Sequence, residues 1–229
     1  MSWRLIIDAD DTLWENNIYF EDAFDRFVEF LDHSALKGPD VREHLNGIEI
    51  ENAKTNGYGS VNFGRNMVEC LHQLSERPVA KRDEESVREF AHAILDHPMV
   101  ILPGVEQTLD YLAGKYDLTL FTKGSSEEQR AKVERSGLAH FFAHVEVTKE
   151  KHPAAYLDLT LLRGMARELA WMVGNSPKSD INPALEAGLN AAYVPHSRTW
   201  VLEREELRPT GGAGRLLVLE NFAGLREHF

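Results

Sequence analysis

The sequence has only one cysteine, Cys70, and no run of apolar residues approaches the roughly 20 that are needed to cross a bilayer. A lone cysteine excludes a disulfide bond within the chain, which favours a reducing compartment. The first residues, Met1–Arg4, lead directly into an apolar segment and lack the architecture of a signal peptide. We therefore expect a cytoplasmic protein that has no membrane partner.

A surplus of basic residues is also missing. The 229-residue chain carries 25 Lys and Arg against 37 Asp and Glu, which gives a formal net charge of −12. Nucleic-acid binding needs a basic surface to meet the phosphates, so we expect no nucleic-acid partner. A small phosphorylated molecule needs only one or two well-placed cations, and such a ligand is compatible with this composition.

What the sequence does have is a group of acids directly after an apolar segment. Leu5–Ile7 reads as a short buried strand, and Asp8, Asp10 and Asp11 follow it. Residues two apart on a strand share a face, so Asp8 and Asp10 start out as neighbours. Paired carboxylates suit a Mg²⁺ ion, or a division of labour between nucleophile and general acid–base. The alternative is a solvated turn or a helix N-terminus, where Asp is also favoured.

The chain changes character near residue 99. Residues 15–98 carry apolar side chains at helical spacing and predict a small all-helical unit. From residue 99 onward, short apolar segments alternate with helical patterns, which is typical of a parallel sheet with helices on both faces. The expected strands are 99–102, 117–121, 145–147, 170–173, 191–194 and 216–219. A long helix is expected from Pro153 to about Leu169.

The first strand has no strand partner nearby in the sequence, so it must join the later sheet. The predicted fold class is therefore α/β, a Rossmann-like parallel sheet with helices on both faces. Its core would consist of residues 1–14 and 99–229, and residues 15–98 would form an inserted helical domain.

Several polar clusters follow the expected strands. They are Asp8 to Asp11, Thr122 with Lys123, and the segment from Asn175 to Asp180, with Lys149 and Lys151 just before a helix. In an open α/β sheet, ligands bind outside the carboxyl ends of the strands, so these groups would meet at one place. Acids for a metal ion, together with cations and N–H donors for oxygens, suit metal-assisted phosphoryl transfer.

The segment Asp8-Ala9-Asp10-Asp11-Thr12, preceded by apolar residues, resembles the first motif (hhhDxDxT) of the haloacid dehalogenase superfamily. Thr122 resembles the second motif, Lys151 the third, and Gly174-Asn175-Ser176 with Asp180 the fourth. The resemblance covers about two thirds of the chain, and four weak motifs in the right order make it specific. The helical insertion is similar to the cap of the phosphatase branch of that superfamily.

The resemblance implies a magnesium-dependent phosphomonoester hydrolase acting on a small phosphorylated metabolite. Asp8 would be the nucleophile that forms an aspartyl-phosphate, and Asp10 would be the general acid and base. The Mg²⁺ ion would be held by the Asp8 carboxylate, the Asp10 backbone carbonyl and Asp180.

The phosphate site would also follow from the resemblance. Thr122 and Lys151 would hold the phosphoryl oxygens, and the amides of Asp11 and Lys123 would complete the cradle. The third motif is ambiguous because Lys149 lies close to Lys151. We favour Lys151, because Pro153 and Tyr156 follow it as they do in the family.

One position departs from the family pattern. The fourth motif commonly begins Gly-Asp, whereas this chain has Gly174-Asn175. Asn175 keeps an oxygen ligand but loses a charge, so we expect weaker metal binding that is not abolished.

Other functions remain compatible with the same residues. A 2-haloacid dehalogenase also uses an aspartate nucleophile but needs no magnesium site, and Asp10 with Asp180 favours phosphate. A phosphosugar mutase shares the core residues. A phospho-receiver protein combines acids, Thr and Lys in a shorter chain, and a non-catalytic scaffold on this fold predicts loss of the acids.

The helical insertion contains one further candidate, the glycine-rich segment that includes Tyr58 and is followed by Asn62 and Arg65. We expect these three residues to read the leaving group, with an ordinary interhelical turn as the alternative. The substrate is not specified by the sequence, and we expect a monomer or a homodimer.

Overall fold

The computed structural model describes residues 3–208 and 214–229. The chain divides into two compact units, each described by itself. The α/β unit consists of Met1–Asn17 and Met99–Phe229, and the helical unit consists of Ile18–Pro98.

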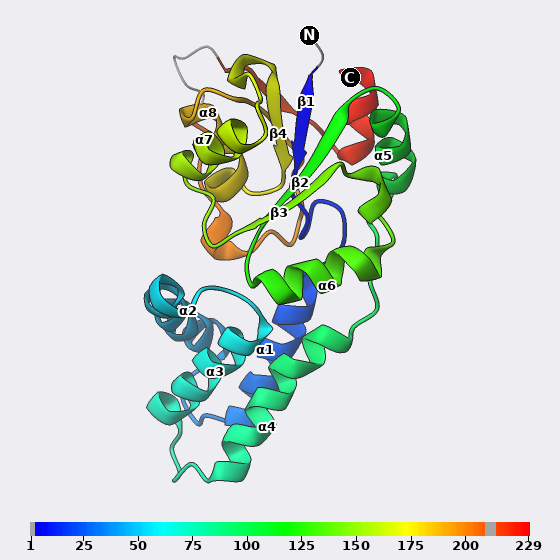
Figure 1. Ribbon diagram of the computed structural model, residues 1–229. Coiled ribbons are helices and arrows are strands. Elements are labelled where there is room, and N and C mark those ends of the chain that lie inside the picture. Colours follow the sequence, from blue (N-terminus) through cyan, green and yellow to red (C-terminus); the bar gives the residue numbers. More distant parts are fainter. Residues whose placement is uncertain (1–2, 209–213) are drawn as a thin grey trace. The chain divides into compact units, whose positions relative to one another are not determined.

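The α/β unit contains a six-stranded parallel sheet, whose first four strands are labelled in Figure 1. The strands are β1 (Arg4–Ile7), β2 (Asp117–Lys123), β3 (His144–Thr148), β4 (Ala170–Gly174), β5 (Asn190–Tyr193) and β6 (Leu216–Val218). Their order across the sheet is β3-β2-β1-β4-β5-β6. The predicted α/β fold with a parallel sheet is thus confirmed.

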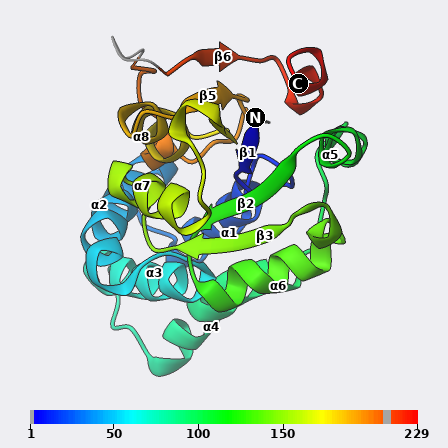
Figure 2. The same ribbon diagram turned by 45° about the horizontal axis from the view of Figure 1, so that its top comes forward.

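Alternate side chains of β1 build the two layers of the core. Leu5 and Ile7 face one apolar cluster, whereas Ile6 faces another. The first cluster is covered by α5 (Val105–Ala113), α6 (Ser126–Ser136) and a C-terminal 3-10 helix (Phe222–Glu227). The second is covered by α7 (Pro153–Leu162) and α8 (Asn182–Glu186). Figure 2 shows α6 and α7 on opposite faces of the sheet.

Shorter turns complete the α/β unit. Its 3-10 turns are Ala139–Phe141, Arg167–Leu169 and Val201–Glu203, and a π-helical turn covers Pro177–Ile181.

The order of the strands fixes the place of a ligand site. The chain builds outward from β1 through β2 to β3, then crosses to the other side with β4. Ile7 of β1 is aligned with Val173 of β4, so the segments after these two strands begin at the same level. Such a switch point is where open α/β sheets bind ligands.

The helical unit is built from four α-helices and one 3-10 turn. They are α1 (Asn17–Leu31), α2 (Gly38–Asn56), α3 (Ser60–Leu74), α4 (Lys81–His92) and the turn Ala93–Asp96. The helices bury an apolar core that includes Phe27, Leu45 and Met67. A Cβ on Gly64 would lie 3.0 Å from the Cβ of Ala91, so this glycine permits the close packing of α3 on α4.

Two expectations about secondary structure are wrong. Residues 99–102 do not form a strand of the sheet; instead, Ile101 makes an isolated antiparallel bridge with Trp14, in the turn after β1. The predicted helix from Pro153 to Leu169 ends at Leu162, because Gly164 takes a left-handed conformation with φ of 59°.

No helix within residues 3–208 and 214–229 has the length and apolar character that spanning a bilayer requires.

Candidate active site

The acidic segment continues directly from β1 into a tight turn. The amide of Asp8 donates to the carbonyl of Val173 at 2.9 Å, which extends the β1–β4 pairing to the first acid. Asp11 has a left-handed backbone with φ of 59°, and its amide donates to the carbonyl of Trp14. Asp tolerates this conformation better than most residues, so the turn can present three acids in succession.

The centre of the site is a buried group of three charges. The Lys151 ammonium donates to Asp8 Oδ1 at 2.5 Å and to Asp180 Oδ1 at 2.8 Å. The exposed fractions of Asp8, Lys151 and Asp180 are 7, 4 and 1%, so water screens these charges little. Lys149, in contrast, is exposed.

Two carboxylates face one ammonium here, which leaves an excess of negative charge. Burial alone would lower the pKa of Lys151, but the charges of Asp180 and Asp8 outweigh it and raise that pKa. Burial and the charge of Asp8 raise the pKa of Asp180. A second cation at this place would neutralise the excess.

The loop after β4 is folded tightly around Asp180. The amide of Ser176 donates to Asp180 Oδ2 at 2.9 Å, and a Cβ on Gly174 would lie 2.2 Å from the same oxygen. Only glycine therefore lets the carboxylate approach the end of β4 so closely.

Thr12 and Asn175 join the two loops. The Thr12 hydroxyl lies 2.9 Å from Asp8 Oδ2 and 3.3 Å from Asn175 Oδ1. The backbone amide of Asn175 donates to the same hydroxyl at 3.1 Å. The side-chain amide of Asn175 donates to Thr199 at 3.0 Å. Thr12 thus connects Asn175, a predicted metal ligand, with Asp8, the nucleophile candidate.

Asp10 has a different environment, because its side chain is 22% exposed. Trp14 Nε1 donates to Oδ1 at 2.8 Å, and Gln129 Nε2 donates to Oδ2 at 3.0 Å. Lys132 Nζ lies 3.2 and 3.0 Å from the two oxygens. Gln129 Nε2 also donates to the Thr122 hydroxyl at 2.5 Å, so it connects Asp10 with the end of β2.

Lys123, the residue after Thr122, is held by an acid far along the chain. Its ammonium donates to Glu203 Oε1 at 2.6 Å and to the Ser179 hydroxyl at 3.1 Å. Glu203 Oε2 accepts from the Ser176 hydroxyl at 2.6 Å. Burial would raise the pKa of Glu203, but Lys123 and these hydrogen bonds lower it.

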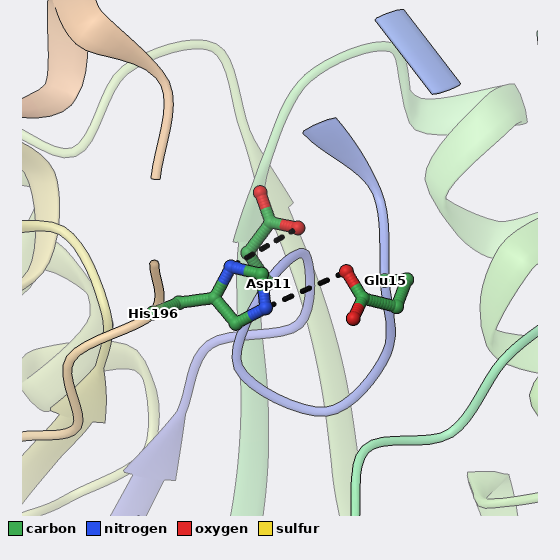
Figure 3. A group of neighbouring side chains, drawn as sticks. All are labelled: Asp11, Glu15 and His196. Carbon is green, nitrogen blue, oxygen red and sulfur yellow. Dashed lines mark ion pairs between the residues drawn. The ribbon is translucent and has the colours of Figure 1, made fainter. Parts of the chain in front are cut away.

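Asp11 belongs to a third group, drawn in Figure 3. His196, from the segment after β5, places its ring between Asp11 at 3.8 Å and Glu15 at 3.4 Å. Ligand atoms of the three residues lie within 4.8 Å of one another, so they could together hold a metal ion. Burial raises the pKa of Asp11 to about 7, against the hydrogen bonds from Asn16 and Asn17.

The predicted specificity residues lie in the helical unit at the start of α3. Asn62 Nδ2 donates to the carbonyl of Asn56 at 2.5 Å, and Arg65 Nη1 donates to Asn62 Oδ1 at 2.9 Å. Arg65 is exposed and Tyr58 is half-buried. Asn62 therefore closes the turn between α2 and α3 and fixes Arg65 beside it.

The structure brings most of the predicted residues into linked groups. Asp8, Lys151, Asp180 and Asn175 form one group with Thr12, and Asp10 is linked to Thr122 through Gln129. Sequence reasoning missed Gln129, Lys132, Glu203 and His196. The i, i+3 spacing of Gln129 and Lys132 on a helix was the one available signal, and it is common on surface helices.

Comparisons with known proteins identify the family of the chain. A model of the family described as haloacid dehalogenase-like hydrolase matches residues 5–194. A phosphoserine phosphatase from Thermus thermophilus is 28% identical over 183 residues, which are 77% of this chain and 70% of the relative.

Solved structures are similar over nearly the whole chain. A haloacid dehalogenase-like family hydrolase from Xanthomonas campestris has a TM-score of 0.79 and 31% identity, covering 93% of this chain and 87% of its own. The L-2-haloacid dehalogenase from Xanthobacter autotrophicus has a TM-score of 0.66 and 17% identity, covering 99 and 98%. At that identity the second likeness concerns the fold alone.

Proposed function

Since the chain belongs to the haloacid dehalogenase-like hydrolase family, we propose that it is a phosphatase that hydrolyses small phosphomonoesters through an aspartyl-phosphate on Asp8. The observation that carries the proposal is the buried contact of Lys151 with Asp8 and Asp180, at 2.5 and 2.8 Å. A dianionic phosphoryl group needs a cation beside the attacking carboxylate, because like charges would otherwise repel.

In the first half of the reaction, an oxygen of the Asp8 carboxylate attacks phosphorus and the bond to the ester oxygen breaks. Asp10 donates a proton to the leaving oxygen, which departs as the alcohol. The hydrogen bond from Thr12 at 2.9 Å leaves Asp8 with a fixed orientation for this attack.

In the second half, the Asp10 carboxylate takes a proton from water while the water oxygen attacks phosphorus. The acyl-phosphate bond breaks, phosphate leaves, and the Asp8 carboxylate is restored. Lys151 and the Thr122 hydroxyl hold the oxygens of the transferring group in both halves.

The donor set of the site fits Mg²⁺. Asp8, Asp180 and Asn175 offer only oxygen ligands, and the two buried carboxylates exceed the single charge of Lys151. Asp8, Asp180, the Asp10 carbonyl and Asn175 would hold the ion. When bound, it would supply positive charge to the phosphoryl oxygens.

A 2-haloacid dehalogenase remains the main alternative within the family. That reaction needs no magnesium site, and a halide leaving group needs no proton from Asp10. The charge excess at Asp8 and Asp180 therefore favours a metal-dependent reaction. The likeness to the phosphoserine phosphatase from Thermus thermophilus also supports a phosphomonoester as substrate.

The helical unit is the proposed source of specificity. Arg65, fixed by Asn62, offers an exposed cation to a second anionic group of the substrate, and Tyr58 offers an aromatic surface. We expect Arg65→Ala to raise KM on anionic leaving groups while kcat stays unchanged.

The deciding experiment is a screen of small phosphomonoesters, with O-phosphoserine included, in the presence of Mg²⁺ or of a chelator. We expect phosphate release that requires Mg²⁺ and is lost in Asp8→Asn. Halide release from 2-chloropropionate would instead identify a dehalogenase. Isomerisation of a hexose phosphate without phosphate release would identify a mutase. Unchanged hydrolysis by Asp8→Asn would refute the proposal.

A further inference from the structure

We propose that Lys132 and Gln129, on one face of α6, form a clamp that positions the Asp10 carboxyl for its work on the leaving oxygen. The inference rests on the proposed phosphatase function and adds two positioning residues to it. Neither belongs to the four sequence motifs that carry the family resemblance.

The clamp is built around both oxygens of Asp10. Lys132 Nζ lies 3.0 Å from Oδ2 and 3.2 Å from Oδ1, while Gln129 Nε2 donates to Oδ2 at 3.0 Å. Trp14 Nε1 donates to Oδ1 from the other side at 2.8 Å. A carboxyl held by donors on both oxygens loses its rotation about the Cβ–Cγ bond, which would otherwise aim it away from a substrate.

The clamp is itself held in place. Lys132 Nζ also contacts Asn16 Oδ1 at 2.7 Å and lies 3.8 Å from Glu128 Oε1, one helical turn earlier. Its side chain is only 12% exposed. A buried lysine loses hydration and rotamer freedom, and here contacts with Asp10, Asn16 and Glu128 offset those losses.

Gln129 gives the clamp its connection to the phosphate site. The same Nε2 atom reaches Asp10 Oδ2, the Thr122 hydroxyl at 2.5 Å and the Lys123 carbonyl at 3.0 Å. The distance between the acid–base carboxyl and a phosphate-binding hydroxyl is thereby set by one buried side chain. The leaving oxygen and the phosphoryl oxygens are bonded to the same phosphorus atom, so a fixed spacing between Asp10 and Thr122 can position both at once.

The clamp predicts a selective defect. A leaving group that needs protonation depends on a well-aimed Asp10, whereas p-nitrophenolate leaves without help. In Lys132→Met we expect kcat/KM with Mg²⁺ to fall about 10- to 100-fold on phenyl phosphate and less than about 3-fold on p-nitrophenyl phosphate. Lys132→Arg should restore part of the loss on phenyl phosphate, since it keeps a donor cation.

Arg130→Met is the matched control, because it removes one positive charge from an exposed position on the same helix. We expect it to leave both substrates unaffected. Circular dichroism and thermal melting of each variant establish that the helix is intact.

A second measurement separates positioning from a general structural role. If Lys132 acts through Asp10, then Lys132→Met should cause no further loss on phenyl phosphate in an Asp10→Asn background. Equal losses of kcat/KM on the two esters in Lys132→Met would contradict the positioning role of the clamp, and so would additive losses in the double variant. Neither result would contradict the proposed phosphatase function. Hydrolysis of both esters by Asp8→Asn would instead contradict the proposed phosphatase function.

Discussion

Two places in the chain, one in each unit, bury acidic side chains in opposite ways. In the α/β unit, Asp8, Lys151 and Asp180 are each less than a tenth exposed, and every one has a partner of opposite charge within 2.8 Å. In the helical unit, Glu49 is 8% exposed, and its Oε2 atom has no hydrogen-bond partner in the described part of the chain. The two arrangements have different consequences for the protein.

Buried groups of opposite charge that contact one another at strand ends form a preorganised site for chemistry. Fixed ionic groups in a dry pocket interact strongly and need no reorganisation during a reaction. A single acid inside an apolar helical core does not have this property. It lowers stability whenever it is ionised.

The largest expected effect comes from breaking the charged group. Lys151→Met leaves Asp8 and Asp180 facing each other without a cation, so we expect phosphatase activity to fall about 100- to 1,000-fold. The free energy of unfolding should also fall, by about 3–5 kcal/mol, because buried carboxylates remain unpaired. Steady-state kinetics and urea denaturation measure the two effects.

Lys149→Met removes the same charge two residues earlier from an exposed position. It should leave activity and stability within the error of wild type. A similar loss in both variants would mean that overall charge, rather than the Lys151 contacts, is responsible.

A smaller effect is expected from Gly174→Ala. The new methyl group would lie 2.2 Å from Asp180 Oδ2, so the carboxylate or the end of β4 must move. A displacement of this size at a reacting centre lowers kcat by about 10- to 100-fold. Gly224→Ala, whose Cβ would have no neighbour nearer than 3.8 Å, should be harmless. Wild-type kcat in Gly174→Ala would contradict the account of the β4 loop.

The smallest effect, one on stability alone, concerns Glu49. Burial raises its pKa from 4.5 to about 7, while Arg42 acts in the opposite direction. Between pH 4.5 and about 7, Glu49 is therefore protonated in the folded state and ionised in the unfolded state. The free energy of unfolding consequently falls as the pH rises through this range. Above pH 7 the cost approaches about 3 kcal/mol.

Glu49→Gln should therefore increase the free energy of unfolding at pH 8 and change it little at pH 4. Urea denaturation at both pH values tests this, with Glu43→Gln, which is exposed on the same helix, as the control. Equal effects of Glu49→Gln at the two pH values would contradict the assignment of a raised pKa.

Much of the fold followed from patterns in the sequence. The apolar segment Leu5–Ile7, without a partner nearby, had to join the later sheet, and it lies at the centre of that sheet as β1. Residues 99–102 have the same apolar character but pair with the turn at Trp14 instead. The periodicity of apolar residues cannot distinguish a sheet strand from an isolated bridge, because the pairing partner of a short extended segment depends on the tertiary structure.

The residues of the candidate site were predictable only where they lie at the ends of the strands β1 to β4 or in the segments that come directly after them. Asp8, Lys151 and Asp180 come from segments after β1, β3 and β4, and parallel topology alone brings such segments to one edge. Glu203 and His196 come from the segment after β5, whose path has no regular pattern to read. Lys132 was missed because a lysine on a polar helix usually faces water.

The central claim is that Asp8 carries the phosphoryl group during turnover. The most direct test is to mix the enzyme with Mg²⁺ and p-nitrophenyl phosphate, quench in acid within the first turnover, and map the peptides by mass spectrometry. We expect one phosphoryl group on Asp8 in the wild-type protein and none in Asp8→Asn. Phosphate release without any modified Asp8, or a phosphoryl group on another residue, would contradict the mechanism.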